Sequence, residues 1–380
     1  MKGNGAKRAA TGRLTGLVFL VVILAAILAV PDPARANGPS AGGLPAALVF
    51  SPQVLDRTSA RLAADDPALA SALDGLIREA DAAMAAPADS VVLKPEPPPG
   101  GGLHDYWSLD PGFADMADPC AETFDRMRMR RMARHVLTLA LAWKLTGNAE
   151  YAGKGTALLW AWCCDSQTRA RPHLDRARTR PGSIIGTPAG IMEGRDLIAA
   201  AEAACLLATS PAWSGPVDRE VRGWFADYLH WLRRSESGRL AAADQGDLGL
   251  WHAAQVTAFA RLTGNDALAR ATAEAMRGRM APPLRSGMEL RAMLILAAVA
   301  EGTGVDLWHT SGLRGILEAL TAGPTATPDG DTDCVPDCAD RLLPPDDAPL
   351  FHRAALVYKE PRYLDLAGAG ADHVRAALAH

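Results

Sequence analysis

The sequence has little of the material from which β-strands are built. Tyrosine occurs only 5 times, and aromatic residues make up 6% of the 380 positions. No segment alternates apolar and polar residues convincingly, and the enrichment in valine, isoleucine, threonine and tyrosine that strands need is absent. The sequence therefore predicts a predominantly α-helical protein.

An excess of basic charge is missing as well. The formal net charge is −4, and lysine and arginine do not gather into a domain with excess positive charge. The one locally basic run, residues 125–135, is interpreted as a solvated helix face. The composition therefore gives no support to a nucleic acid partner.

Cysteine is scarce, and its spacing does not fit a zinc site. Of the 6 cysteines, Cys334 and Cys338 stand close together without a histidine or a second cysteine pair at a zinc spacing. They are expected to form a disulfide or to remain free thiols. Cys163 and Cys164 lie in an apolar helical segment and are expected in the core. We predict no metal, no cofactor and no cysteine nucleophile.

The N-terminus has the pattern of an export signal. Basic residues precede the apolar run from Leu14 to Val30, and an Ala-Arg-Ala sequence ends at Ala36. Residues 1–36 are therefore expected to be a signal peptide that is cleaved after Ala36, which places the protein in the periplasm or outside the cell. The alternative is an uncleaved anchor, because the apolar run is just short of a comfortable membrane span. This anchor is the only expected link to a membrane.

The rest of the chain is expected to be a flexible tether, residues 37–50, and a single domain, residues 51–380. Helical patterns start at Ser51 and Pro52, which suit the cap and the first position of a helix. They recur over residues 126–146, 149–163, 190–209, 214–234, 250–262, 266–280, 286–303 and 310–322, with the connector Leu-Thr-Gly-Asn occurring twice. Non-identical paired helices without a fixed repeat favour an α/α toroid, an incomplete barrel of helical hairpins, over an open solenoid.

Function in such a protein is expected on loops at one end of the ring. Residues 101–112 bring together the side chains of His104, Asp105, Tyr106 and Trp107. This combination of aromatic and hydrogen-bonding groups suits a sugar ring. The alternative is that the two aromatic side chains pin the loop to the core.

Residues 169–197 are rich in arginine and lead into the next helix. Arg178 lies in this segment, and Glu193 and Arg195 stand near its end. Guanidinium groups in a cleft bind carboxylates and phosphates through paired hydrogen bonds, which predicts an anionic ligand. A solvated surface is the alternative.

A third candidate, residues 238–255, places Asp247 between two glycines and just before Trp251 and His252. A glycine-flanked carboxylate beside an aromatic ring and an imidazole is typical of a functional site. Asp247 could equally cap the helix that is expected to begin near Leu250.

Four segments, residues 94–111, 137–162, 223–255 and 301–308, resemble successive blocks of the alginate lyase family. This resemblance implies an α/α toroid, a periplasmic setting, an acidic polysaccharide partner and β-elimination at a uronate. In that family, an Asn-Asn-His-Gly segment followed by Trp neutralises the substrate carboxylate and supplies a histidine. A tyrosine in a Tyr-Ser-x-x-Asn-Leu context transfers the proton.

This chain departs from the family at those positions. Asp247 and Leu248 stand where the second Asn and the His are expected, and Arg285 and Glu289 stand at the Tyr and Asn of the second motif. Leucine has no transferable proton, and the guanidinium group, with a pKa above about 12, is a poor acid or base near neutrality. The usual catalytic residues are therefore expected to be lost, although Asp247 and Arg285 still mark the site.

Three functions and a structural alternative remain open from the sequence. The preferred one is an altered, exported family member that binds an acidic exopolysaccharide. The second is an active lyase with a substitute base, His252, His104 or His173. The third is a glycoside hydrolase that pairs Asp247 with Asp105, Glu193 or Glu289. The structural alternative is an exported helical protein without a ligand.

Overall fold

The computed structural model describes residues 43–281, 284–321, 348–360 and 362–363. The expected signal peptide, the first part of the expected tether, and Cys334 and Cys338 lie outside the described residues. Within the described residues, no helix is both long enough and apolar enough to cross a bilayer.

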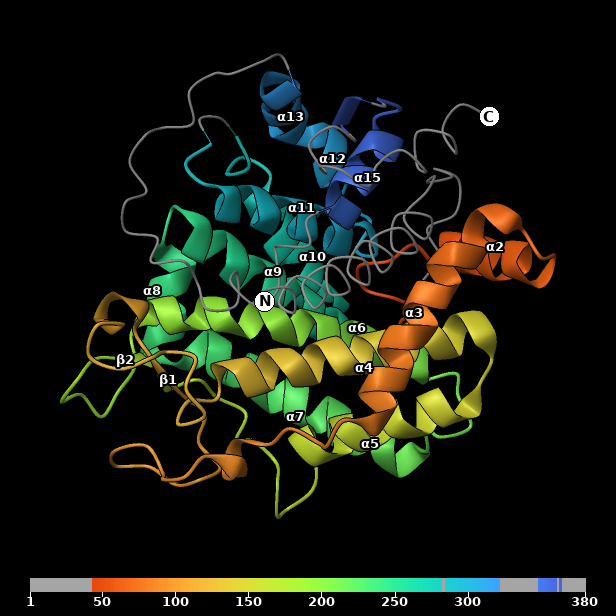
Figure 1. Ribbon diagram of the computed structural model, residues 1–380. Helices are drawn as coiled ribbons and strands as arrows, with labels where there is room; N and C mark the ends of the chain where they lie inside the picture. The colour runs from red at the N-terminus through yellow and green to blue at the C-terminus, as the bar shows by residue number, and fades with distance from the viewer. Residues whose placement is uncertain (1–42, 282–283, 322–347, 361, 364–380) are drawn as a thin grey trace, which may run out of the picture.

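The described chain is mainly helical, as predicted (Figure 1). The α-helices are α2 (Pro52–Ala63), α3 (Pro67–Ala85), α4 (Arg126–Thr146), α5 (Ala149–Cys163), α6 (Asp196–Leu207), α7 (Gly215–Arg234), α8 (Glu236–Ala243), α9 (Asp247–Leu262), α10 (Asp266–Met276), α11 (Gly287–Glu301), α12 (Leu307–Thr310), α13 (Leu313–Thr321) and α15 (Ala348–Val357). Short 3-10 segments are η1 (Val91–Leu93), η2 (Pro111–Phe113) and η3 (Pro188–Arg195).

The two Leu-Thr-Gly-Asn connectors fold in the same way, because each residue type meets a local backbone need. Gly147 and Gly264 have φ angles of 72° and 78°, which glycine adopts without a steric penalty. The side-chain oxygens of Asn148 and Asn265 then accept hydrogen bonds from the first turns of α5 and α10. Each connector therefore ends one helix and starts the next.

Two short strands were not predicted. β1 (Trp107–Leu109) and β2 (Arg176–Thr179) have 3 and 4 residues and pair in parallel. Strands of this length are too short for their alternation to be visible, and their partners lie far apart in the sequence. The pair matters here because it joins two of the three candidate segments, residues 101–112 and 169–197.

The helices pack around one core. α4 packs on α3, α5 and α6, and α9 packs on α7, α10 and α11. Figure 1 shows α4 to α7 in its lower half, α9 to α11 above them, and β1, β2 and α8 together at one end. η3 contacts β2, α8 and α9. The three candidate segments are therefore gathered at one end of the molecule, as expected for functional loops.

The described cysteines separate into buried thiols and one disulfide. Cys163 is buried, as expected, and so is Cys205, whereas Cys164 is half-buried. Cys120 is disulfide-bonded. Burial raises the pKa of the Cys163 and Cys205 thiols. Because the thiolate is the reactive form, these two groups are poor nucleophiles.

Candidate functional site

The loop that leads into α9, residues 244–249 (the α9 entry loop), is built around Asp244. Its carboxylate Oδ1 accepts hydrogen bonds from the backbone N–H groups of Gly246 at 2.8 Å and Gly249 at 3.2 Å. Gly249 has no room for a side chain, because a Cβ atom there would lie 2.1 Å from the Asp244 carbonyl oxygen. The sequence interpretation missed Asp244, although an acidic residue two positions before a glycine is a recognised turn signal.

Asp247 is the first residue of α9, and the N-cap position belongs to Gly246. The expectation that Asp247 caps a helix starting near Leu250 is therefore wrong in register. Its Oδ1 accepts a hydrogen bond from the neighbouring Leu248 N–H at 2.7 Å. The carboxylate is half-buried and lies at the start of α9, where a negative charge interacts favourably with the helix dipole.

The start of α11 meets this loop. The Arg285 guanidinium donates to the Gln245 carbonyl at 3.1 Å, so the structure brings the two predicted catalytic positions, Asp247 and Arg285, into one neighbourhood. Glu289 is 4% exposed. Its carboxylate accepts from the Arg285 backbone N–H at 2.7 Å, while its own N–H donates to Ser286 Oγ at 3.1 Å. This reciprocal cap gives Glu289 a structural role in place of the expected contact with substrate.

Trp251 and His252 lie in the core, although the sequence suggested that they bind substrate. Their exposed fractions are 1% and 8%. His252 Nε2 lies 3.2 Å from the Leu232 carbonyl and must donate to it, because a carbonyl oxygen only accepts. Burial lowers the pKa of His252. The imidazole is therefore held neutral, inside the protein, and away from a ligand.

Glu193 is the centre of a buried polar cluster under β1 and β2. The carboxylate Oε2 accepts from Tyr106 Oη at 2.8 Å and from Ser108 Oγ at 2.6 Å. The guanidinium groups of Arg178 and Arg126 lie 3.5 and 3.8 Å from Oε1. Glu193 and Tyr106 are each 1% exposed, and burial, followed by the adjacent carboxylate, raises the pKa of the Tyr106 hydroxyl. Ser108 was not anticipated from the sequence. Arg126 lies in the basic run that was interpreted as a solvated helix face, but it is 3% exposed, so that interpretation is wrong for this residue.

Arg178 has a strained backbone at this cluster. Its φ is +52°, in the left-handed region that non-glycine residues avoid. Its N–H donates to Ser108 Oγ at 2.8 Å, and a Cβ at Gly186 would lie 2.0 Å from the Ala177 carbonyl oxygen. The tight packing of these loops keeps Arg178 in this unfavourable backbone conformation. Strained backbone conformations of this kind are found at functional sites.

Trp107 and Arg195 serve the scaffold. Trp107 Nε1 donates to Thr179 Oγ1 at 2.9 Å, and its ring makes an edge contact with Phe124 at a centroid distance of 5.0 Å. Arg195 is 8% exposed and donates to the Met192 carbonyl at 3.3 Å. For Tyr106 and Trp107, the structure agrees with the alternative that they pin the loop to the core.

The Asp105 carboxylate contacts basic side chains of the arginine-rich segment, residues 169–197. It is 2% exposed, and it accepts from the Gly102 N–H at 2.8 Å and from Arg171 at 3.0 Å. Arg176 Nε lies 3.7 Å away. Burial acts to raise the pKa of Asp105, but the Gly102 N–H, Arg171 and His173 together hold it below its ordinary value. Asp105 is therefore a fixed negative charge that positions basic side chains above it.

His173 has both ring nitrogens engaged. Nδ1 accepts from the Asp175 backbone N–H at 3.4 Å, and Nε2 lies 3.4 Å from an Asp105 carboxylate oxygen. Burial lowers the pKa of His173 more than Asp175 and Asp105 raise it, so the neutral ring is favoured. The assignment of Nδ1 as acceptor and Nε2 as donor satisfies both contacts.

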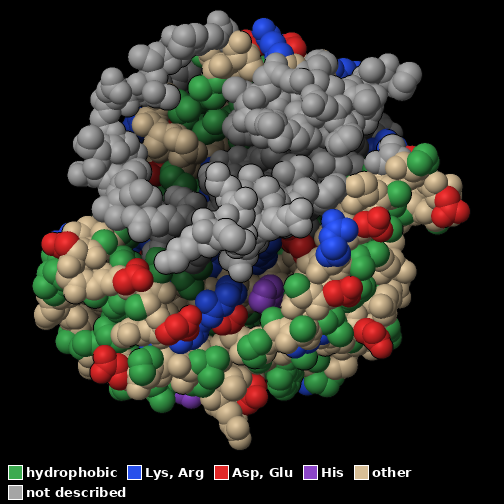
Figure 2. Space-filling view, in the orientation of Figure 1, with side chains coloured by type: hydrophobic (Ala, Val, Ile, Leu, Met, Phe, Trp, Pro, Cys, Tyr) green, Lys and Arg blue, Asp and Glu red, His purple; other side chains and the backbone are tan. Residues whose placement is uncertain are grey.

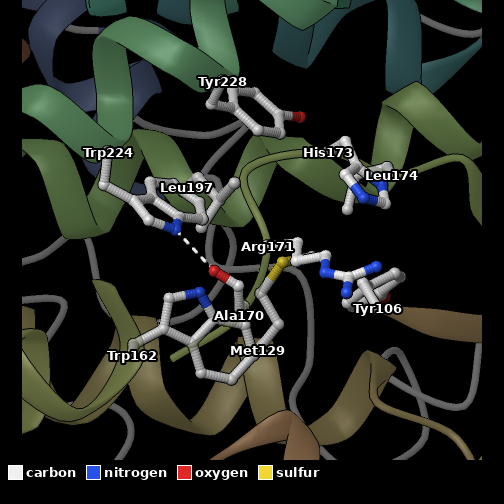
Figure 3. Close-up of a pocket in the computed structure, with 10 residues that line it drawn as sticks. All are labelled: Tyr106, Met129, Trp162, Ala170, Arg171, His173, Leu174, Leu197, Trp224 and Tyr228. Atoms are coloured by element: carbon white, nitrogen blue, oxygen red, sulfur yellow. Dashed lines mark hydrogen bonds between the residues drawn. The ribbon is translucent and has the colours of Figure 1, made fainter. Parts of the chain in front are cut away.

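An aromatic pocket lies between this loop and α7. Figure 3 shows Arg171, His173 and Tyr106 on one side of the pocket and Trp162 and Trp224 on the other. Its cavity volume is about 10 Å³, which is room for about one water molecule. A sugar ring therefore cannot enter the pocket and would have to lie on its rim.

The carboxylates proposed as partners of Asp247 are all engaged elsewhere, and a hydrolytic pair is not favoured. Asp105 holds the arginine loop, Glu193 accepts two hydroxyl hydrogen bonds, and Glu289 caps α11. Among the described residues, no group of three or more histidine, cysteine, aspartate or glutamate side chains could hold a metal ion.

Comparison with known proteins gives one family and one fold. The family model described as alginate lyase matches residues 91–284. The crystal structure of an alginate lyase from Bacteroides ovatus aligns with a TM-score of 0.73 and 21% sequence identity, covering 87% of this chain and 98% of that one. This similarity confirms the predicted α/α toroid. No curated protein sequence matches the chain.

Proposed function

The chain belongs to the alginate lyase family, and on this premise we propose that it is an exported protein that binds an acidic, uronate-containing polysaccharide without the family's usual elimination machinery. The family and the fold support the polysaccharide class. The altered residues of the α9 entry loop support the loss of catalysis.

Arg285 carries the proposal. Where the family resemblance places a proton-transferring tyrosine, the Arg285 guanidinium is bonded to the Gln245 carbonyl, three residues before Leu248. Leu248 stands at the expected histidine position. A guanidinium with a pKa above about 12 and a leucine side chain cannot exchange a proton with a sugar near neutral pH. Asp247 adds a negative charge where a uronate carboxylate has to be neutralised, which opposes the reaction further.

The histidines that could replace the lost base are engaged in structural hydrogen bonds. His252 is buried and donates to Leu232. His173 uses one nitrogen on the Asp175 backbone and directs the other at Asp105. His104 Nδ1 lies 2.6 Å from the Arg169 carbonyl. His104 Nε2 makes no hydrogen bond to another described residue, and it is available as a hydrogen-bond acceptor for a ligand.

Binding measurements test the proposal. The purified protein is titrated with polymannuronate, polyguluronate and polyglucuronate, and with a neutral glucan as control. We expect binding to at least one polyuronate and none to the glucan. Raising the salt from 0.1 to 1 M, which shortens the screening length from about 10 to about 3 Å, weakens ionic binding. Absence of binding to every polyuronate, or equal binding to the neutral glucan, contradicts the proposal.

Export is tested separately by N-terminal sequencing of the protein recovered from its native compartment. Cleavage after Ala36 gives a mature chain that begins at Asn37. Recovery of the intact N-terminus in the membrane fraction would instead identify residues 14–30 as an anchor, whereas an intact chain in the cytosol would contradict export.

A further inference from the structure

The segment 169–171 directs two arginines to the same side. Ala170 is 2% exposed, its N–H donates to the Trp162 carbonyl at 2.8 Å, and its carbonyl accepts from Trp224 Nε1 at 2.7 Å. Figure 3 shows this last bond at the base of the aromatic pocket. Ala170 is therefore turned towards the core, whereas Arg169 and Arg171 on either side of it are exposed.

His104 lies against the same segment, and its orientation fixes its tautomer. The Arg171 N–H donates to the His104 carbonyl at 2.9 Å, and His104 Nδ1 lies 2.6 Å from the Arg169 carbonyl. The carbonyl only accepts, so Nδ1 carries the proton and Nε2 of the neutral ring is an acceptor. The position therefore offers a hydrogen-bond acceptor between two cationic side chains.

These groups line one depression on the surface. His104, Ser166, Arg169 and Arg171 surround a cavity of about 170 Å³; we call these four residues the arginine rim. The Arg171 side chain is 58% exposed although Asp105 holds it from below. Arg169 is exposed and makes no side-chain hydrogen bond or ion pair to any other described residue. Asp105 also serves Arg176 and His173, so the rim carries excess positive charge.

From this geometry we infer that the arginine rim binds the carboxylate of a uronate residue in the polymer, at a position separate from the α9 entry loop. Arg169 and Arg171 would share the carboxylate through charge-assisted hydrogen bonds. His104 Nε2 would accept a hydrogen bond from a sugar hydroxyl, and Ser166 adds a second hydroxyl contact. The inference rests on the proposed function for the identity of the polymer, and it assigns the residues that select an acidic sugar.

Figure 2 shows how charged side chains are distributed on one face of the molecule. Among the described residues on the face shown there, lysine and arginine side chains lie next to aspartate and glutamate side chains. Some exposed arginines have such a partner; Arg314 on α13, for example, is 57% exposed and pairs with Glu318 at 2.9 Å. A cation that lacks a protein partner and lines a cavity is able to take one from a ligand.

The test compares three variants with the wild-type protein on polymannuronate and on the same polymer after chemical reduction of its carboxyl groups. Arg169→Gln is the decisive variant, because no described contact depends on that side chain. We expect a dissociation constant about 10 to 100 times higher, the usual effect of losing one hydrogen bond to a charged group. Arg171→Gln should weaken binding similarly. Arg314→Gln, matched in exposure and in its acidic partner, should change binding less than about twofold.

The reduced polymer separates carboxylate recognition from other effects. On it, wild-type protein and Arg169→Gln should bind equally weakly, because the group that Arg169 recognises is gone. Equal binding of wild type and Arg169→Gln to native polymannuronate overturns the inference and leaves the proposed function standing. A loss in Arg169→Gln that persists on the reduced polymer also overturns it. Wild-type protein that binds no polyuronate at all overturns the proposed function and this inference with it.

Discussion

The α9 entry loop and the arginine rim use polar side chains in opposite ways. In the loop, the groups of Asp244, Arg285 and Glu289 satisfy backbone N–H and carbonyl groups of the protein itself. At the rim, the buried Asp105 carboxylate holds Arg171, and the side chains of Arg169 and Arg171 remain exposed. The polar groups of the first region are bonded within the protein, whereas the arginine side chains of the second face solvent.

Under the proposed function, the fold has persisted while the chemistry of the site has changed. Under that proposal, Arg285 is tolerated at a former catalytic position because its guanidinium cross-links the α9 entry loop at the Gln245 carbonyl. Substitutions at the arginine rim are expected to reduce stability more, because a buried carboxylate such as Asp105 is stable only with its basic partners. The two regions should therefore respond very differently to substitution.

The largest loss of stability is expected from Asp105→Ala, at the arginine rim. Removing this buried carboxylate leaves Arg171, Arg176 and His173 without their shared partner and the Gly102 N–H unsatisfied. We expect the free energy of unfolding to fall by about 1 to 2 kcal/mol, because the Gly102 N–H loses its partner while the Arg171 side chain is largely exposed to solvent. Urea denaturation of the variant and the wild-type protein measures this loss of unfolding free energy. A loss below about 1 kcal/mol would mean that the rim does not depend on Asp105.

A smaller effect is expected from the buried histidine behind the entry loop. Burial lowers the pKa of His252, so the folded protein favours its neutral form. Its contribution to stability is complete above the unfolded-state pKa of about 6.5 and is lost as the pH falls towards the lower folded-state value. Unfolding midpoints measured between pH 7.5 and 5 should fall less in His252→Gln than in the wild type.

His173 provides the comparison for that experiment at the rim. Burial also lowers its pKa, but Asp175 and Asp105 act in the opposite direction. The sign of the effect is therefore the same as for His252, and the decrease in pH dependence in His173→Gln should be smaller. A larger decrease in His173→Gln than in His252→Gln would show that the carboxylates do not compensate at the rim.

The smallest effect is expected from Asp247→Ala. The carboxylate bonds only the adjacent Leu248 N–H and interacts with the start of α9. An acidic residue at an exposed helix start contributes about 0.3 to 1 kcal/mol, so urea denaturation should show a loss in that range. Affinity for polymannuronate should stay the same or rise, because a repelling charge is removed. A large loss of affinity would place Asp247 in ligand binding and blur the contrast with the rim.

The sequence was sufficient for the helices and insufficient for the contacts between distant segments. Helical periodicity and the Leu-Thr-Gly-Asn connectors predicted most helices, since those signals are local. The bond between Tyr106 and Glu193 joins residues 87 positions apart, and no local pattern announces it. Trp251 and His252 were expected at a ligand because they follow Asp247, but the inward direction of α9 buries them. Packing between helices decides which face of α9 turns inward, and the local sequence does not show it.

The measurement that tests the account most directly is an incubation of the wild-type protein with polymannuronate, polyguluronate and polyglucuronate, under conditions where binding has been demonstrated. Ultraviolet absorbance reports the unsaturated uronate ends that β-elimination creates, and a reducing-sugar assay reports hydrolysis. The account predicts binding without either product. An absorbing product would contradict it, because an acid and a base would then have to act from somewhere other than Leu248 and Arg285.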